Sequence, residues 1–242
     1  MLTLSQREEF ERHGVVRLPG AVPGESVAAM HDGFWKFLSA ERGIDPHRPE
    51  TWPPGTPRRL QALRRSGTFA AMASDDVRAA LDDLFGAGGW QPPDRWGLPL
   101  LTFPDPDTRW SAPTAGWHLD SFGPDHDLPG VTVFVFLAPV AEHGGGTAVL
   151  TGSHRLVNGH IAATGTWRPA DVRTALADAH PWLRDLWAGR PVAADAGPGV
   201  ALRELTGDAG DAVLMHPRTL HAAAPNTATR PRMMLVEIIR RA

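Results

Sequence analysis

The sequence predicts a mainly β protein with flanking helices and an antiparallel jelly-roll core. Several short apolar runs in its second half are separated by Gly- and Pro-rich turns, as expected for the strands of such a core. Helical patterns, in contrast, gather at the front of the chain and in one later insert. At 242 residues the chain is long enough for one large domain, so we expect a single domain over residues 1–242.

The first part of the chain is predicted to be helical, apart from one edge strand and one irregular excursion. Ser5, with Glu8 three residues on, is expected to cap the first helix, and Gly43 is expected to end the longest one. The prolines between Ile44 and Arg59 are too closely spaced for a regular element. In order, the predicted elements are a helix over 5–13, an edge strand over 15–19, a helix over 25–42, the excursion over 44–59, and helices over 60–65 and 75–85.

The remaining predicted elements are strands, interrupted by one helical insert. Residues 131–137 are apolar on both faces, as expected for a strand that is buried between two layers. The glycine- and aspartate-rich residues 207–211 predict a tight turn between two later strands. The predicted strands cover 98–103, 117–122, 131–137, 147–150, 200–205, 212–215 and 233–239, and the insert covers about 171–187.

The composition and charge of the chain limit which kinds of partner and which cellular compartment we expect. The formal net charge is −3 and the pI is near 6.4, which gives no electrostatic reason to expect nucleic acid or an anionic membrane as partner. The absence of Cys excludes disulfides and thiolate metal sites. The start of the chain becomes charged too early for a signal peptide, and the longest apolar stretch is too short to span a bilayer. We therefore expect a cytoplasmic protein that acts on a small molecule, and the oligomeric state stays open.

One short motif and a distant histidine predict a metal site. His118 and Asp120 are two residues apart in a predicted strand, so their side chains project from the same face and can bind one ion together. With His221 they make two histidines and one carboxylate, the ligand set that holds non-haem Fe(II) and leaves coordination positions open. His216 is the alternative to His221, which we prefer because the alanines at 222–224 leave room beside it.

An arginine downstream of the second histidine is the candidate for binding a carboxylate. Arg232 begins the last predicted strand and alternates with Met234 and Val236, so its side chain can face inward. A buried arginine is costly without an anionic partner, and the carboxylate of a co-substrate would supply one. Arg230, next to Pro231, is the alternative and is expected to be solvated.

These residues resemble the phytanoyl-CoA dioxygenase-like family of Fe(II)/2-oxoglutarate oxygenases. The resemblance covers most of the chain and rests on Trp-His-x-Asp at 117–120, Gly-Gly-Thr…Gly-Ser-His at 145–154, and Gly-Asp…His-Pro…Leu-His…Pro-Asn at 210–226, with an arginine downstream. It implies a double-stranded β-helix core, with iron held by His118, Asp120 and His221. It also implies that Arg232 holds 2-oxoglutarate as co-substrate and that O2 is consumed.

The family pattern suggests two further contacts to the co-substrate and a type of reaction. Thr147 is expected either to donate its hydroxyl to the same carboxylate or to be an ordinary strand threonine, and Thr102 is a further candidate of this kind. One departure is Thr151, where the family usually has proline, and it changes no expected ligand. Related branches that halogenate lack the carboxylate ligand, whereas Asp120 is present here, so the resemblance favours hydroxylation or a similar oxidation.

We therefore expect a 2-oxoglutarate-dependent dioxygenase that couples decarboxylation of 2-oxoglutarate to succinate with hydroxylation, or a related oxidation, of a small organic metabolite. The excursion at 44–59 and the insert at about 171–187 are expected to form walls of its pocket. Two alternatives stay open: a jelly-roll metalloenzyme that does not use 2-oxoglutarate, and a non-catalytic jelly-roll binding protein. The sequence does not identify the substrate or the oxidised carbon.

Overall fold

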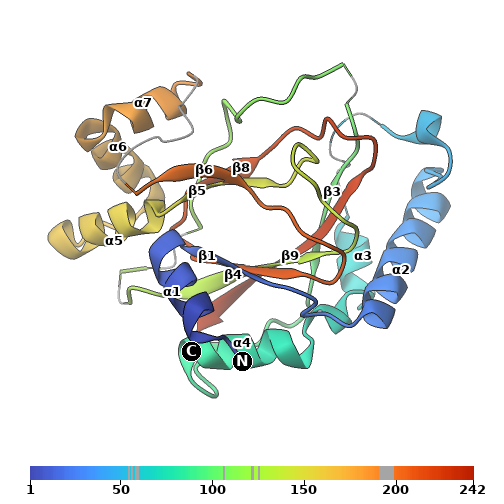
Figure 1. Cartoon of the computed structure of the whole chain (residues 1–242), viewed down its shortest axis with the longest axis horizontal. Helices are drawn as coiled ribbons and strands as arrows, with labels where there is room; N and C mark the ends of the chain where they lie inside the picture. The colour runs from blue at the N-terminus through green and yellow to red at the C-terminus, as the bar shows by residue number, and fades with distance from the viewer. Residues whose placement is uncertain are drawn as a thin grey trace.

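Two β-sheets face each other and form the jelly-roll core (Figure 1). The computed structural model describes residues 1–53, 55, 57, 60–105, 107–120, 123–124, 126–190 and 199–242. All pairings between named strands are antiparallel, and the predicted fold class is confirmed. The larger sheet runs in the order β1-β7-β4-β9-β2 with β3 also on β9, and the smaller one in the order β6-β5-β8. The strands are β1 (Val15–Leu18), β2 (Trp90–Gln91), β3 (Leu98–Thr102), β4 (Gly130–Phe136), β5 (Thr147–Thr151), β6 (Ala201–Glu204), β7 (Ala212–Met215), β8 (His221–Ala223) and β9 (Arg232–Arg241).

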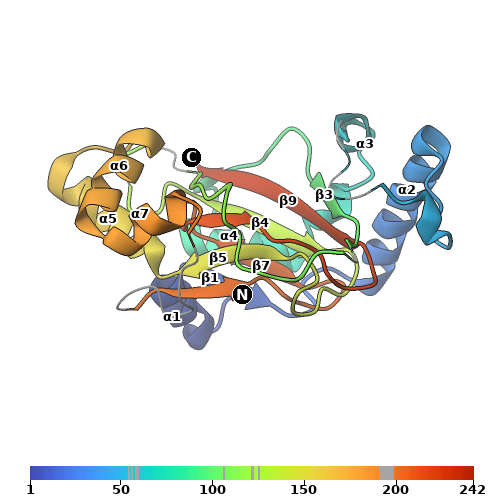
Figure 2. The same ribbon diagram turned by 90° about the horizontal axis from the view of Figure 1, so that it is seen from above.

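Helices cover the outer faces of both sheets. Buried side chains of the first helices pack on the outer face of the larger sheet, and those of the last three helices pack on the smaller sheet. In Figure 2 this second group lies at one end of the molecule and α2 at the other. The helices are α1 (Leu4–His13), α2 (Gly24–Arg42), α3 (Gln61–Arg65), α4 (Asp75–Phe85), α5 (Ser153–Thr164), α6 (Pro169–Ala179) and α7 (Pro181–Trp187), with 3-10 turns η1 (Pro49–Thr51) and η2 (Ala70–Met72). Among the described residues, no helix has both the length and the apolar character needed to cross a bilayer.

Strand β4 shows how the core is divided between the two faces of the larger sheet. All of its residues are buried, as predicted for a strand between two layers. Val131, Val133 and Val135 belong to the cluster beneath the N-terminal helices. Phe134 and Phe136 belong to a second cluster, inside the sandwich. The period-2 alternation therefore places the even-numbered residues of β4 between the sheets.

Most predicted elements are present, but the short strands β2 and β8 were not predicted, and the helical insert forms two helices, α6 and α7. Three further differences concern single elements. The first helix is capped by Thr3 instead of Ser5, because the Thr3 hydroxyl and the Gln6 side chain form a reciprocal capping box. Helix α5 was not predicted; it begins after Gly152 and buries Val157 and Ile161 on one side. The expected strand over 117–122 is a single antiparallel bridge at His118, and residues 121 and 122 lie outside the described residues.

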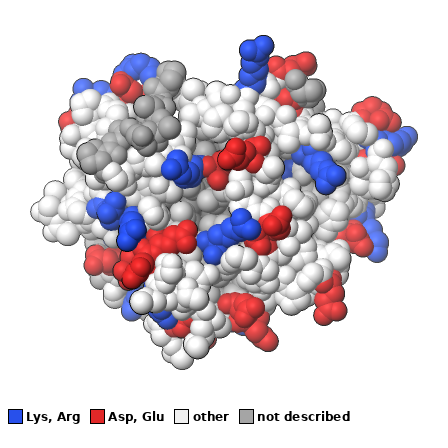
Figure 3. Space-filling view, in the orientation of Figure 1, with Lys and Arg blue, Asp and Glu red and all other residues white. Residues whose placement is uncertain are grey.

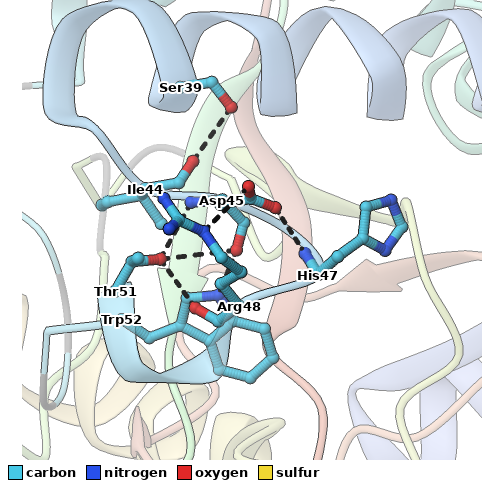
Figure 4. Close-up of polar contacts among 7 residues, drawn as sticks. All are labelled: Ser39, Ile44, Asp45, His47, Arg48, Thr51 and Trp52. Atoms are coloured by element: carbon cyan, nitrogen blue, oxygen red, sulfur yellow. Dashed lines mark hydrogen bonds and ion pairs between the residues drawn. The ribbon is translucent and has the colours of Figure 1, made fainter.

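The proline-rich segment that follows α2 is ordered by one aspartate (Figure 4). Asp45 Oδ1 accepts the His47 backbone N–H at 2.8 Å, and the Asp45 carbonyl accepts the Trp52 indole N–H at 2.8 Å. The Thr51 hydroxyl accepts the Asp45 N–H at 2.9 Å, which closes the turn. These bonds hold Trp52 against Phe103, with ring centroids 5.6 Å apart. The segment therefore contains one 3-10 turn, although proline excludes longer regular structure; residues 54, 56, 58 and 59 lie outside the described residues.

Charges on the surface are mixed in sign. On the face shown in Figure 3, basic and acidic side chains alternate over the described residues, and no extended area of a single sign is visible there. Exposed charges also pair with each other, as Arg184 does with Asp178 at 3.3 Å. The surface thus agrees with the near-neutral composition.

Candidate metal centre

The structure brings His118, Asp120 and His221 together at one point. One candidate ligand atom from each of the three lies within 4.8 Å of the others, and no other such group of three occurs among the described residues. His118 and His221 exchange both backbone hydrogen bonds, at 3.0 and 2.9 Å, which joins two segments far apart in the chain. The Asp120 N–H donates to the Pro217 carbonyl at 2.7 Å. Backbone pairing between distant segments, and not the local motif alone, therefore brings the three side chains together.

Hydrogen bonds to carbonyls select the nitrogen that each histidine offers. His118 Nδ1 donates to the Gly116 carbonyl at 2.8 Å, and His221 Nδ1 donates to the Thr219 carbonyl at 3.0 Å. A carbonyl can only accept, so Nδ1 carries a proton in both rings, and in the neutral form of each ring Nε2 is the nitrogen with the lone pair. His221 Nε2 lies 3.9 Å from Asp120 Oδ2. Both imidazoles are therefore prepared to ligate through Nε2, in the way metal-bound histidines are oriented by their second nitrogen.

The electrostatics of the cluster favour the form that binds metal. Burial lowers the pKa of His221, because the charged imidazolium is poorly solvated there, while the nearby Asp120 opposes that shift. Asp120 is itself fixed by the Thr132 hydroxyl, which donates to Oδ2 at 2.8 Å. Two neutral nitrogens and one carboxylate on a common side suit a divalent iron and leave other coordination positions open. The residues present therefore fit the group that the sequence predicts.

Arg232 lies between the sheets, where no described acidic side chain forms an ion pair with it. It is 4% exposed, and its Nη2 donates to the Thr102 hydroxyl at 2.7 Å. Its Nε has no hydrogen-bond partner, and none of the ion pairs within the described part of the chain includes it. Burial lowers the pKa of Arg232 to about 10, and Glu204 opposes the shift. A buried guanidinium in this state favours binding of a carboxylate, whereas the alternative, Arg230, is exposed.

Thr147, Trp117 and Leu119 each lie on the side of the chain that the period-2 alternation of a strand predicts. Thr147 is buried on β5, two residues from Val149, which belongs to the cluster between the sheets, so both face inward. Among the described hydrogen bonds, none joins Thr147 to Arg232. Trp117 and Leu119 pack beneath α5–α7, on the far side from the ligands. Thr102 is therefore the threonine that contacts the arginine directly.

His216, the alternative second histidine, lies outside the cluster. Its Nδ1 accepts the Arg218 backbone N–H at 3.1 Å, so its Nε2 donates to the Asp127 carbonyl at 2.8 Å. Its ring lies against that of His154, with centroids 4.9 Å apart. Burial lowers the pKa of His216 to about 3 and that of His154 to about 4. Both ring nitrogens of His216 are engaged by backbone, so its geometry indicates a structural role.

Two residues near the centre were missed by the sequence analysis. Arg218 is 1% exposed; its guanidinium donates to Asn158 Oδ1 at 2.6 Å and to the carbonyls of Gly123 and His126, both at 2.8 Å. No periodicity marks an arginine in an irregular segment, so only burial reveals it. Thr132 had a weak signal, because it is the one polar residue of the apolar run 131–137.

A cavity of about 640 Å³ opens between the free edges of β1 and β6. Its inner wall includes Val149, Leu205 and Val213, which belong to the cluster between the sheets. Val149 is paired with His221 across β5 and β8. The cavity therefore reaches the strand next to the metal ligands, and its volume suits a small organic molecule.

Comparison with solved structures shows proteins of similar fold. HygX from Streptomyces hygroscopicus, solved with nickel and 2-oxoglutarate, has a TM-score of 0.59 and 17% identity over 99% of this chain and 87% of its own. EvdO2 from Micromonospora carbonacea var. aurantiaca, complexed with 2-oxoglutarate, has a TM-score of 0.57 and 18% identity over 100% of this chain and 92% of its own. The epimerase SnoN from nogalamycin biosynthesis, in complex with Fe3+, alpha ketoglutarate and nogalamycin RO, has a TM-score of 0.52 and 21% identity over 98% of this chain and 82% of its own. At these identities the likeness concerns the fold.

A search of curated proteins gave no match. The family model for phytanoyl-CoA dioxygenase (PhyH), however, matches residues 10–234. That range contains all strands except most of β9, together with the cluster of two histidines and one aspartate and the buried arginine. The chain therefore belongs to the phytanoyl-CoA dioxygenase (PhyH) family.

Proposed function

We propose that this protein is an Fe(II)- and 2-oxoglutarate-dependent oxygenase that oxidises a small organic metabolite. One observation carries the proposal: a 2-His-1-carboxylate cluster and a buried arginine that forms no ion pair with a described residue lie between the same two sheets. A metal site alone would leave the cost of burying Arg232 unexplained. A co-substrate with a carboxylate would give Arg232 an anionic partner, beside a metal that His118, Asp120 and His221 would hold.

The solved structures with this fold support the choice of cofactor and co-substrate. HygX holds nickel and 2-oxoglutarate, and SnoN holds Fe3+ and alpha ketoglutarate. SnoN is an epimerase, and the similar SnoK, also from nogalamycin biosynthesis, is a carbocyclase. Hydroxylation is the reaction proposed here because Asp120 is present, and the product analysis below distinguishes it from epimerisation or ring closure.

Each described residue has a defined task in this proposal. When bound, iron and 2-oxoglutarate would activate O2 and couple oxidation of the substrate to release of succinate and CO2. His118 and His221 would supply neutral Nε2 donors, and Asp120 would supply one negative charge. Arg232 would hold the distal carboxylate of 2-oxoglutarate, with Thr102 orienting the guanidinium.

The substrate would bind within a single domain formed by the whole chain. The 640 Å³ cavity beside β5 offers room for a small molecule and contains apolar side chains from both sheets. We propose that residues 44–59 and about 171–187 form further walls of the pocket. In support, Trp52 packs on Phe103, next to Thr102, and helices α6 and α7 pack beneath Trp117 and Leu119.

The test combines metal binding, co-substrate binding and product analysis. Purified protein is titrated anaerobically with Fe(II), and 2-oxoglutarate is then added while the visible spectrum is recorded. Succinate is measured with O2, ascorbate and a panel of candidate metabolites, and each product is identified by mass. A gain of one oxygen atom supports hydroxylation, and an unchanged mass with inverted stereochemistry supports epimerisation.

The two alternatives give different results in the same experiment. A metalloenzyme that does not use 2-oxoglutarate would bind Fe(II), but its spectrum would not respond to 2-oxoglutarate. A non-catalytic binding protein would take up no Fe(II). Either result would refute the proposed function.

A further inference from the structure

The metal carboxylate is contacted by a threonine from the opposite sheet. Thr132 Oγ1 donates a 2.8 Å hydrogen bond to Asp120 Oδ2, the oxygen that lies 3.9 Å from His221 Nε2. Thr132 is 1% exposed and faces the interior of the sandwich on the same side of β4 as Phe134. The hydroxyl thus reaches from the larger sheet to the segment that carries the ligands.

The two partners differ in how firmly their backbones are held. β4 is a central strand, and Thr132 is paired with Met215 of β7 on one side and with Ile238 of β9 on the other. Asp120 lies in an irregular segment, where its backbone makes one described hydrogen bond, to Pro217. A hydrogen bond between them therefore fixes the Asp120 carboxylate relative to the larger sheet, although the Asp120 backbone is itself less constrained.

Threonine is chemically suited to this task. Its β-branched side chain has few rotamers in a strand, so the backbone of β4 largely determines where the hydroxyl points. A buried hydroxyl needs an acceptor, and an ionised carboxylate is a stronger one than a neutral carbonyl. Valine has nearly the same shape without the hydrogen-bond donor, which makes the contact separable from packing.

We propose that Thr132 is a positioning residue for the metal centre, which holds the Asp120 carboxylate in the orientation in which it binds the cation. This inference rests on the proposed function, since it assumes that His118, Asp120 and His221 bind a divalent metal. Partners that orient metal ligands typically contribute about 10- to 100-fold to metal affinity. The Thr132 hydroxyl is expected to contribute within that range.

The experiment compares Thr132→Val, Thr132→Ser and the control Thr151→Val with the wild-type protein. Thr151 is also buried in a strand, but its hydroxyl donates to the Ala201 carbonyl at 3.1 Å and is not bonded to a metal ligand. Dissociation constants for Mn(II) and Co(II) are measured by calorimetry on the full-length proteins, below their melting temperatures. The Co(II) absorption spectrum reports the ligand geometry without any turnover.

The expected order separates positioning from packing. Thr132→Val should weaken Co(II) binding about 10- to 100-fold and change the Co(II) spectrum. Thr151→Val should weaken binding by less than about threefold, which corresponds to well under 1 kcal/mol. Thr132→Ser, which keeps the donor but loses the rotamer restriction, should fall between them.

Each other outcome overturns a specific step. If Thr132→Val binds Co(II) as tightly as wild type, or if both valine variants weaken binding equally, Thr132 has no positioning role. If Thr132→Val does not fold, Thr132→Ala, which also removes the donor, takes its place: affinity and spectrum identical to wild type would again refute the inference. If the wild-type protein itself binds neither Mn(II) nor Co(II), the proposed function falls together with this inference.

Discussion

Arg232 provides the sharpest test of the proposed co-substrate site. Its guanidinium is buried, it donates to the Thr102 hydroxyl, and its Nε has no partner among the described residues. Arg232→Met preserves much of the length and volume of the side chain and removes the charge. The matched control is Arg230→Met, two residues earlier, where the side chain is exposed.

The expected magnitude follows from the loss of a desolvated ion pair. Truncating one partner of a buried, hydrogen-bonded charge pair costs about 2–5 kcal/mol. Since about 1.4 kcal/mol is tenfold in affinity, the dissociation constant of 2-oxoglutarate should rise about 30-fold to several thousand-fold in Arg232→Met. Thr102→Val removes one hydrogen bond that the charged guanidinium donates and should weaken binding about tenfold, for a loss of about 1.5 kcal/mol.

The assay is anaerobic calorimetry of 2-oxoglutarate binding to Mn(II)-loaded protein, so that chemistry does not interfere. Metal affinity is measured first for each variant, since Arg232 should not affect it. The reasoning would be refuted if Arg232→Met changed 2-oxoglutarate affinity less than about threefold, well under 1 kcal/mol. A loss in Arg230→Met without one in Arg232→Met would assign the carboxylate to the alternative arginine.

Three further predictions concern the metal ligand Asp120, the buried Arg218 side chain and the loss of stability at acid pH. Asp120→Ala should abolish both tight Co(II) binding and succinate release, and retention of either would contradict its role as a ligand. Arg218→Met removes a buried guanidinium and leaves two partly buried carbonyls and an amide without their donor, so it should lower the urea-derived free energy of unfolding by about 3 kcal/mol; a change below about 0.5 kcal/mol would contradict this. His154 and His216 have pKa values lowered to about 4 and about 3, so the unfolded chain binds more protons than the folded one below pH 6.5. Stability should be fully present above pH 6.5 and fall by about 2 kcal/mol per histidine by pH 5. His216→Gln should flatten that fall in urea titrations across the pH range, and an unchanged slope would refute the assignment.

Several features could be predicted from the sequence because they depend on neighbours along the chain. Short apolar runs between turn residues predict the antiparallel core, and their order along the chain agrees with the strands observed. The i, i+2 spacing of His118 and Asp120 predicts that both project to one side, and they do so although the segment forms only one bridge. The same period places Arg232 inward with Met234.

The capping of α1 and the existence of α5 show where local reasoning fails. Thr3 and Ser5 are both able to cap a helix, and the reciprocal bond with Gln6 decides in favour of Thr3. Helix α5 contains Gly159 in its interior, which weakens the periodic signal, and its burial against the smaller sheet compensates. In both cases a specific contact outweighs an average preference.

The amino-acid sequence by itself thus determined the type of fold, the family and the chemical types of the candidate ligands. Only the tertiary structure decided that His221 and not His216 joins the cluster, that Thr132 holds the carboxylate, and that Arg218 is buried. The physical reason is that these contacts depend on strand register and on packing between segments far apart in the chain. Shifting one pairing by a single residue would turn every side chain of a strand to the opposite face, and no local spacing encodes that choice.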